Sequence, residues 1–232
     1  MNSKPLIIGY SGALFYFRPE SAKNNKIEIL RNIISKWLWE YRVNNVDYST
    51  RTAIYLFKAI KKLKENCQTL HKHLSVEIWG NIHNDYIKQI DDMEINDIVT
   101  IQGYIPKNET REKIKQCDVM FLPLETSTNS QKSFFMPAKM FDYLQFKKPV
   151  LLLSKESDAS DVIVRAGLGI VTDPKDIDEI ADKIKYLIDN RNNLSEIIQP
   201  DDDYIYNNYH FKNISKKLAH IFDQIVEEYS NS

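Results

Sequence analysis

The sequence predicts an α/β fold: one Rossmann-like domain built on a doubly wound parallel sheet, with a helical insertion near residues 14–48 and a C-terminal helix. Short apolar segments alternate with amphipathic ones along most of the 232 residues, and several apolar segments end at a glycine. Repeated strand–helix units favour parallel strands joined by right-handed crossovers. A chain of this length can bury the core that such a sheet requires.

The strands and helices are predicted in the following order. The first half of the chain supplies strands at 5–12, 74–80, 97–105 and 118–124. A helix is predicted at 50–66, where Leu56, Phe57 and Ile60 recur at helical spacing. Shorter helices are predicted at 83–93 and 107–117. The second half supplies a helix from about Met136, a strand at 149–153, a helix at 158–167, a strand at 168–172 and a helix at 173–190, with Asp173 as its candidate cap.

Two segments fall outside this alternation. Residues 24–42, within the insertion, have an amphipathic pattern that suits a helix packed on its own domain, a face for a missing partner domain, or a helix lying on a membrane surface. Residues 191–210 are polar and precede a predicted helix at 211–229. Asp201 to Asp203 lie in this polar stretch, so we predict a solvated loop there and no metal site.

Composition argues against several classes of protein. The formal net charge of −1 gives no general basic field, so a nucleic-acid partner is not expected. No apolar run approaches the roughly 18 residues that a membrane-spanning helix needs. Cys67 and Cys117 lie far apart without a CxxC pattern, which predicts reduced thiols in a cytoplasmic protein.

Three glycines follow predicted strands. They are Gly12, Gly80 and Gly103. Ligands of open α/β sheets bind outside the carboxyl ends of the strands, where a glycine lets the backbone approach a ligand closely. A turn alone also explains a glycine at each position, so both interpretations stay open.

The helix that begins near Met136 follows a long polar loop, residues 125–135. Its first N–H groups and partial positive charge suit an anion such as a diphosphate. Lys139 in the first turn adds a full charge, and Asp142, one turn later, suits the diol of a ribose. The alternative is that Lys139 and Asp142 form a solvent-exposed pair at spacing i, i+3.

These motifs resemble a known family. The run DVMFLPL, then MPAKMFDYLQFKKPVLLL, then AGLGIVTDPKDIDEIADKIKYL is similar to the C-terminal half of GT-B glycosyltransferases, and most similar to glycosyltransferase family 4. The family pattern Pro-x-Lys-x-Phe-Glu-Tyr followed by Pro-Val appears as Pro137, Lys139, Phe141, Asp142, Tyr143, Pro149 and Val150. TRTAIYLFKAI, VEIWG and IQGYIP extend the resemblance, which covers roughly residues 5–12 and 50–190.

The resemblance implies a domain that binds a nucleotide-sugar donor and requires no metal or other cofactor. The residue at the position of Asp142 would hold the ribose hydroxyls. The diphosphate would meet Arg51, Ser133, Phe134, Phe135, Met136 and Lys139. The base would lie near the strand-end loops, at Gly12, Gly80, Gly103, Tyr104 and Ile105. The implied reaction transfers the glycosyl group to an acceptor hydroxyl with retention of configuration.

The sequence departs from the family pattern at the donor site. The family carries a second glutamate eight positions before the acidic residue, and Phe134 stands there. Glu125 is the nearest acid upstream, and Asp142 is one methylene shorter than the usual glutamate. Arg51 and Thr52 replace a lysine and a glycine, and the insertion at 14–48 interrupts the first loop.

The family has two Rossmann-like domains, and residues 1–232 match only the second. We therefore expect the N-terminal acceptor domain to be missing, as a separate piece or a partner subunit, and this chain to be inactive alone. Surface polysaccharide or glycoconjugate synthesis, in the cytoplasm at the inner face of a membrane and with peripheral membrane association, is the expected context by analogy. The alternatives are a non-catalytic regulatory subunit that uses the helix around Trp37 and Trp39, or an epimerase or phosphorylase of the same fold.

Overall fold

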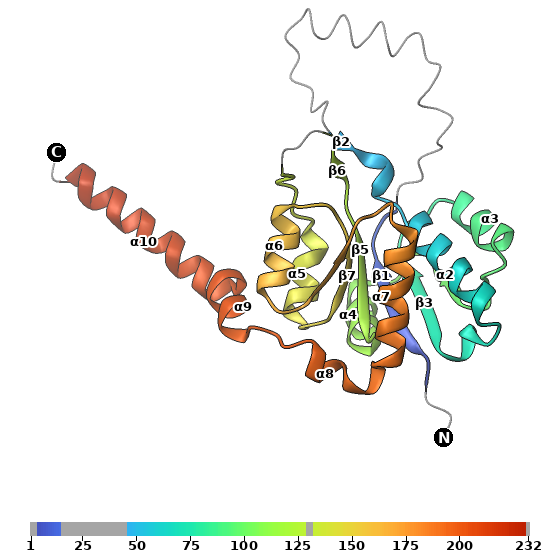
Figure 1. Ribbon diagram of the computed structural model, residues 1–232. Helices are drawn as coiled ribbons and strands as arrows, with labels where there is room; N and C mark the ends of the chain where they lie inside the picture. Colours follow the sequence, from blue (N-terminus) through green and yellow to red (C-terminus); the bar gives the residue numbers. More distant parts are fainter. Residues whose placement is uncertain (1–3, 15–45, 129–131, 231–232) are drawn as a thin grey trace, which may run out of the picture.

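The computed structural model describes residues 4–14, 46–128 and 132–230. Its centre is a sheet of six parallel strands in the order β4-β3-β1-β5-β7-β8, with helices on both faces (Figure 1). The strands are β1 (Leu6–Ser11), β3 (Leu74–Trp79), β4 (Val99–Ile101), β5 (Val119–Pro123), β7 (Val150–Leu153) and β8 (Gly169–Thr172). The predicted Rossmann-like parallel sheet is therefore confirmed. Most of the predicted insertion, with Trp37 and Trp39, lies outside the described residues.

Alternation along the strands divides the core between the two faces. In β5, Val119 and Phe121 join the apolar cluster under α2 (Ile54–Asn66) and α7 (Ile177–Asp189), whereas Met120 and Leu122 join the opposite cluster. The opposite cluster lies under α4 (Lys107–Gln116), α5 (Ala138–Gln145) and α6 (Asp158–Arg165). All four residues of β7 are buried, as expected for a strand covered on both faces. This two-sided core fixes the strand ends that carry the site.

Some predicted boundaries were wrong, for local reasons. The strand predicted at 97–105 ends at Ile101, because the chain turns at Gly103, which has a φ of +71°, and enters α4 after Pro106. The helix predicted from 173 begins at Ile177. Asp176 is its cap and accepts from the Glu179 amide, while Asp173 accepts from the Lys175 amide in the preceding turn.

The polar stretch at 191–210 is not a loop. It contains the 3₁₀ turn η3 (Arg191–Asn193), α8 (Leu194–Ile197) and α9 (Asp202–Tyr209). The acidic run therefore begins a helix: the Asp201 side chain accepts from the Tyr204 amide at 2.8 Å. Carboxylates at a helix start are stabilised by its free N–H groups and dipole. In the part of the chain that the structure describes, no cluster of three or more metal-ligating side chains occurs.

A second, two-stranded sheet lies at the carboxyl edge of the first. β2 (Val46–Asp47) pairs antiparallel with β6 (Thr126–Ser127), and the 3₁₀ turn η1 (Tyr48–Thr50) follows β2. This pairing brings Thr50, just before α2, beside the end of β5: the Thr50 hydroxyl donates to the carbonyl of Leu124, 74 residues further along the chain. The short helix α3 (Asp85–Asp92) follows β3, and its Tyr86 and Ile90 join the same apolar cluster as α2.

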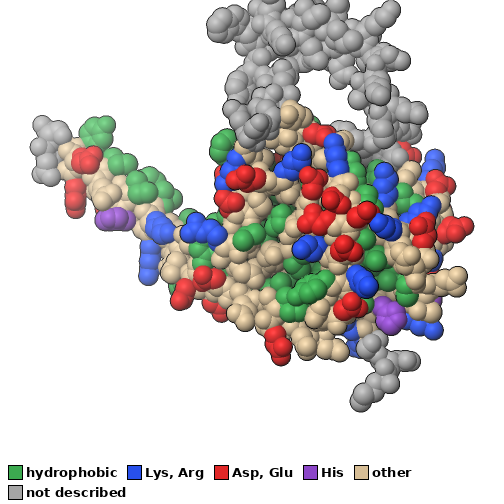
Figure 2. Space-filling view, viewed as in Figure 1, with side chains coloured by type: hydrophobic (Ala, Val, Ile, Leu, Met, Phe, Trp, Pro, Cys, Tyr) green, Lys and Arg blue, Asp and Glu red, His purple; other side chains and the backbone are tan. Residues whose placement is uncertain are grey.

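The last helix, α10 (Phe211–Ser230), extends away from the domain (Figure 1). One face of α10 is apolar and exposed, with green side chains along the arm in Figure 2. Its exposed members are Phe211, Ile214, Leu218, Ile221, Phe222, Ile225, Val226 and Tyr229. Among the described helices, none is both long enough and apolar enough to span a bilayer.

Candidate functional site

A cleft of about 340 Å³ opens at the carboxyl edge of the sheet, where β1 and β3 end. The direction of strand order reverses between β1 and β5, and this reversal is where open α/β sheets bind ligands. The lining residues are Ser11, Gly12, Trp79, Gly80, Tyr104, Ile105, Lys107, Thr110, Ala138, Lys139 and Asp142. The structure thus brings six of the predicted site residues to one cleft: Gly12, Gly80, Tyr104, Ile105, Lys139 and Asp142.

The glycine turns pack on one another at the base of this cleft. The Gly12 amide donates to the Trp79 carbonyl at 2.9 Å, and the Gly80 amide donates to the Gly103 carbonyl at 2.6 Å. A Cβ at Gly80 would lie 2.2 Å from the Gly12 carbonyl oxygen, and the φ of Gly80 is +134°. Close approach of the turns to one another is therefore sufficient to require glycine at position 80.

Lys139 holds its ammonium inside the cleft rather than at the surface. Its Nζ donates to the Tyr10 hydroxyl and lies 4.0 Å from the centroid of the Tyr10 ring. Tyr10 in turn donates to the Ala13 carbonyl at 2.8 Å, so the tyrosine oxygen is the acceptor for Lys139. Burial, and after it the nearby Arg51 guanidinium, lower the pKa of Lys139 to about 7.

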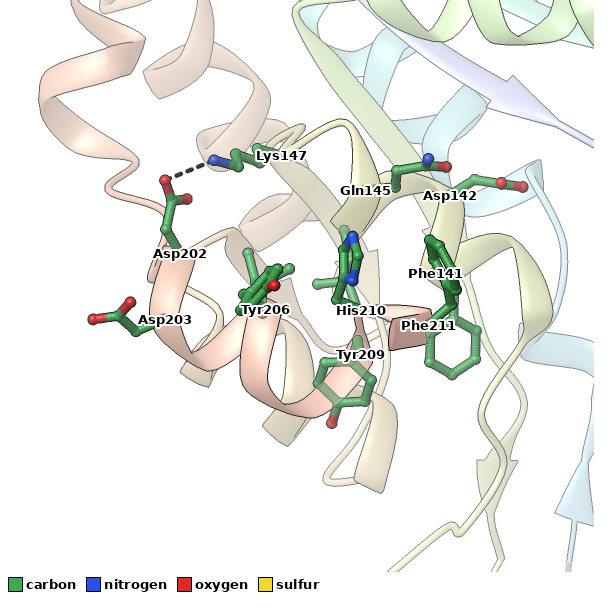
Figure 3. A pocket seen from close by; sticks show the side chains of 12 residues that line it. Phe141, Asp142, Gln145, Lys147, Asp202, Asp203, Tyr206, Tyr209, His210 and Phe211 are labelled. Carbon is green, nitrogen blue, oxygen red and sulfur yellow. Dashed lines mark hydrogen bonds and ion pairs between the residues drawn. The ribbon is translucent and has the colours of Figure 1, made fainter. Parts of the chain in front are cut away.

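Asp142 lies one turn after Lys139 on α5 and lines the same cleft. Within the described residues the two form no ion pair, so the alternative of an exposed i, i+3 pair is wrong. Asp142 also reaches a second cavity, but in Figure 3 its carboxylate extends away from the aromatic side chains there. Its position suits a ligand that contacts Lys139 at one end and Asp142 at the other.

The other predicted residues do not line the cleft; they are Arg51, Gly103, Ser133, Phe134, Phe135 and Met136. Arg51 has Nη1 3.7 Å from Oε2 of Glu125, and its guanidinium lies 4.9 Å from the centroid of the Phe135 ring. The Ser133 amide donates to the Glu156 carbonyl at 3.5 Å, and the Phe135 amide donates to the Ser133 hydroxyl at 3.4 Å. Both bonds are long and weak. Two amides of the predicted diphosphate loop therefore already have protein partners, though poor ones.

A larger cavity, of about 650 Å³, lies between α5 and the α9–α10 junction (Figure 3). Aromatic rings dominate its wall: Phe141 and Tyr209 have ring centroids 5.8 Å apart, and Tyr206 and Phe211 lie nearby. An ion pair of 2.6 Å between Lys147 and Asp202 crosses one end. The sequence does not predict this cavity, because the polar composition of residues 191–210 indicates a solvated loop instead of helices.

A model of the family "Glycosyl transferases group 1" matches residues 49–207, more than half of the chain. The chain belongs to this family. No curated protein matches it by sequence.

Several solved structures share the fold. Anabaena Alr3699/HepE in complex with UDP is 14% identical, with a TM-score of 0.61 over 95% of this chain and 49% of that one. A mutant of S. aureus TarM in complex with Fondaparinux, alpha-GlcNAc-glycerol and UDP is 15% identical, with a TM-score of 0.61 over 94% and 35%. The C-terminal domain of LpcC from Francisella tularensis is 16% identical, with a TM-score of 0.56 over 90% and 89%. The chain therefore spans about half the length of HepE and about a third of the length of TarM. It spans 89% of the isolated LpcC domain.

Proposed function

We propose that this chain is the donor-binding half of a retaining glycosyltransferase, similar to family 4, and that it binds a nucleoside-diphosphate sugar. The observation that carries the proposal is the Lys139 ammonium, held with a lowered pKa at the switch point of the sheet and within the field of Arg51. Two cations kept close together in a cleft suit a dianionic group. The complexes of HepE and TarM with UDP support a ligand of this class.

The cleft residues take separate parts in this proposal. Lys139 and Arg51 face the diphosphate, and their charge stabilises it as it leaves the sugar. Asp142 accepts hydrogen bonds from the ribose hydroxyls. Tyr104, 82% exposed beside the cleft, offers a ring face to the base. The donor is a substrate in this scheme, and no metal or further cofactor takes part.

The acceptor site and the rest of the catalytic machinery belong to another domain or subunit, which would close over the donor. HepE and TarM are two to three times as long as the region that this chain matches. The apolar face of α10 and the aromatic cavity beside α9 are surfaces suited to that other half. We place the complete enzyme in the synthesis of surface polysaccharides or glycoconjugates, at the cytoplasmic face of a membrane.

A second candidate is a non-catalytic subunit that keeps the fold. Phe134, 79% exposed, stands where the family carries its sugar-contacting glutamate, and this observation favours the second candidate. An epimerase or phosphorylase of the same fold would use the same nucleotide or phosphate cleft.

Calorimetric titration with UDP, GDP and UDP-glucose tests the proposal. We expect at least one of these ligands to bind with a Kd between micromolar and millimolar, and Lys139→Met to weaken that binding at least about 50-fold. If none of them binds to the folded protein, the donor-site proposal fails and the non-catalytic candidate is favoured.

A further inference from the structure

A buried carboxylate lies behind the cleft. Glu125 follows β5 and is only 5% exposed. Its Oε2 has no hydrogen-bond partner among the described residues and lies 3.7 Å from Nη1 of Arg51. Acidic side chains are almost never buried unless paired, and an unbonded buried acceptor is costly. A buried carboxylate with an acceptor oxygen left unbonded among the described residues therefore suggests a functional role for Glu125.

The backbone holds Glu125 rigidly on both sides. The amide of the preceding residue, Leu124, donates to the Leu153 carbonyl at 3.0 Å, and its carbonyl accepts from the Thr50 hydroxyl at 2.8 Å. The following residue, Thr126, pairs with Asp47 between β6 and β2. The main chain at Glu125 is therefore held in place on both sides.

The carboxylate and the Phe135 ring hold the Arg51 guanidinium between them. The guanidinium lies 3.7 Å from the first and 4.9 Å from the centroid of the second, and the Arg51 side chain is 26% exposed. A guanidinium is planar and carries five N–H donors in a fixed fork that matches a carboxylate or a phosphate. The two contacts therefore orient a group whose geometry suits an anion.

We infer that Glu125 is a positioning residue: it fixes the Arg51 guanidinium against Phe135, so that Arg51 meets a diphosphate in the adjoining cleft without reorganising. This inference rests on the proposed function and deepens it. Neither Glu125 nor Arg51 lines the cleft, but only Arg51 carries a charge that attracts a diphosphate, so the carboxylate of Glu125 acts on the ligand through Arg51. Pre-orientation explains this arrangement, because binding to a fixed donor costs less ordering entropy than binding to a mobile arginine.

The test is a double-mutant cycle on UDP affinity. Calorimetry compares the wild type, Glu125→Gln, Arg51→Gln and the double variant. Glu125→Gln keeps the shape of the side chain and removes its charge. We expect it to weaken UDP binding about tenfold when Arg51 is present and less than twofold when Arg51 is already glutamine. Glu125→Asp keeps the charge but moves the carboxylate away from Arg51 by one methylene. Its UDP affinity should lie between those of the wild type and Glu125→Gln.

Two further measurements separate positioning from a loss of folding. The NMR signal of the Arg51 Nε–H, recorded without ligand, should differ from that of an exposed arginine in the wild type and move toward it in Glu125→Gln. Glu77→Gln is the matched control, because Glu77 forms an ion pair of 2.9 Å with Lys113 and does not line the cleft. It should leave UDP affinity unchanged.

Several outcomes would overturn the inference. Equal or tighter UDP binding by Glu125→Gln would show that the carboxylate opposes the ligand instead of positioning its partner. The same loss with and without Arg51 would show an effect that does not pass through Arg51. If the folded wild type binds no nucleoside diphosphate, the proposed function fails first, and the positioning role for a diphosphate fails with it. The Arg51 signal would then report only whether the contact exists.

Discussion

The cleft at the end of β1 buries the charged side chain of Lys139, whereas α10, called the arm below, exposes apolar side chains to water. In the cleft, the Lys139 ammonium has a lowered pKa and donates to the Tyr10 hydroxyl. On the arm, Leu218 and Ile221 are each about half exposed on a helix that leaves the domain. Neither arrangement stabilises the isolated chain.

The difference teaches which kind of partner each region lacks. Desolvated charge gains most from a small ion that brings the opposite charge. An exposed apolar stripe on a helix gains most from another apolar surface of similar extent. We therefore expect changes in the cleft to alter nucleotide binding but not association, and changes on α10 to alter association but not nucleotide binding.

Removing the charge of Lys139 should produce the largest effect. Lys139→Met should weaken UDP binding at least about 50-fold and raise the Tm. The pKa of Lys139 is lower in the fold than in the unfolded chain, so the charged form destabilises the fold, most strongly below pH 7. Calorimetry and thermal denaturation at pH 6 measure both changes. Lys61→Met, on the exposed face of α2, is the control and should change neither. A Tm that falls in Lys139→Met would contradict this account of the cleft.

The same ammonium predicts how affinity depends on pH. Free Lys139 loses its proton as pH rises through about 7, and a bound diphosphate favours the charged form. The affinity for UDP should therefore fall roughly 20-fold between pH 6.5 and 8.5, following the protonated fraction of the free amine. Lys139→Arg, whose charge does not titrate, should bind with a flat profile over this range. A flat profile in the wild type would show that Lys139 does not meet the phosphates.

A smaller effect is expected at Asp142. Asp142→Asn should weaken UDP about fivefold, since a hydrogen bond to a charged group is lost while repulsion from the phosphates is relieved. Binding of 2′-deoxy-UDP should hardly change in the same variant. Equal losses for the two nucleotides would remove Asp142 from the ribose site.

The smallest effect on nucleotide binding should come from the arm. Ile221→Glu together with Ile225→Lys places a favourable i, i+4 pair on the exposed face of α10. UDP affinity and Tm should stay within twofold and within about 2 °C of wild type, because both side chains are about half exposed on a helix that extends away from the domain. Sedimentation velocity should show less self-association, and binding of the dye ANS should fall. A large loss of UDP affinity would show that the arm and the cleft are coupled.

The fold could be predicted from sequence because its signals are local. Strands such as residues 150–153 are continuous apolar runs, and the helices carry apolar side chains at helical spacing. The cleft residues could be assembled too, because Gly12, Gly80 and Lys139 all lie at strand ends or at the helix start that faces them. Parallel strands bring those ends to one edge whatever their order.

The contacts of Arg51 and Glu125 could not be predicted. They are 74 residues apart in the chain, and the pairing of β2 with β6 that brings them together involves only two residues on each strand. Strands this short leave no alternation pattern. The aromatic cavity was missed for a related reason: α9 is short, and its contact partner on α5 is distant in sequence.

The stacked turns beneath the cleft have a consequence for mutational scans. At position 80 even a methyl group would clash with the Gly12 carbonyl, at 2.2 Å from its oxygen. Every replacement should therefore inactivate the protein by forcing two strand ends apart. Such intolerance resembles that of a residue that touches substrate. A scan scored by activity alone would rank Gly80 beside Lys139, and only a parallel measurement of folded abundance would separate steric exclusion from chemistry.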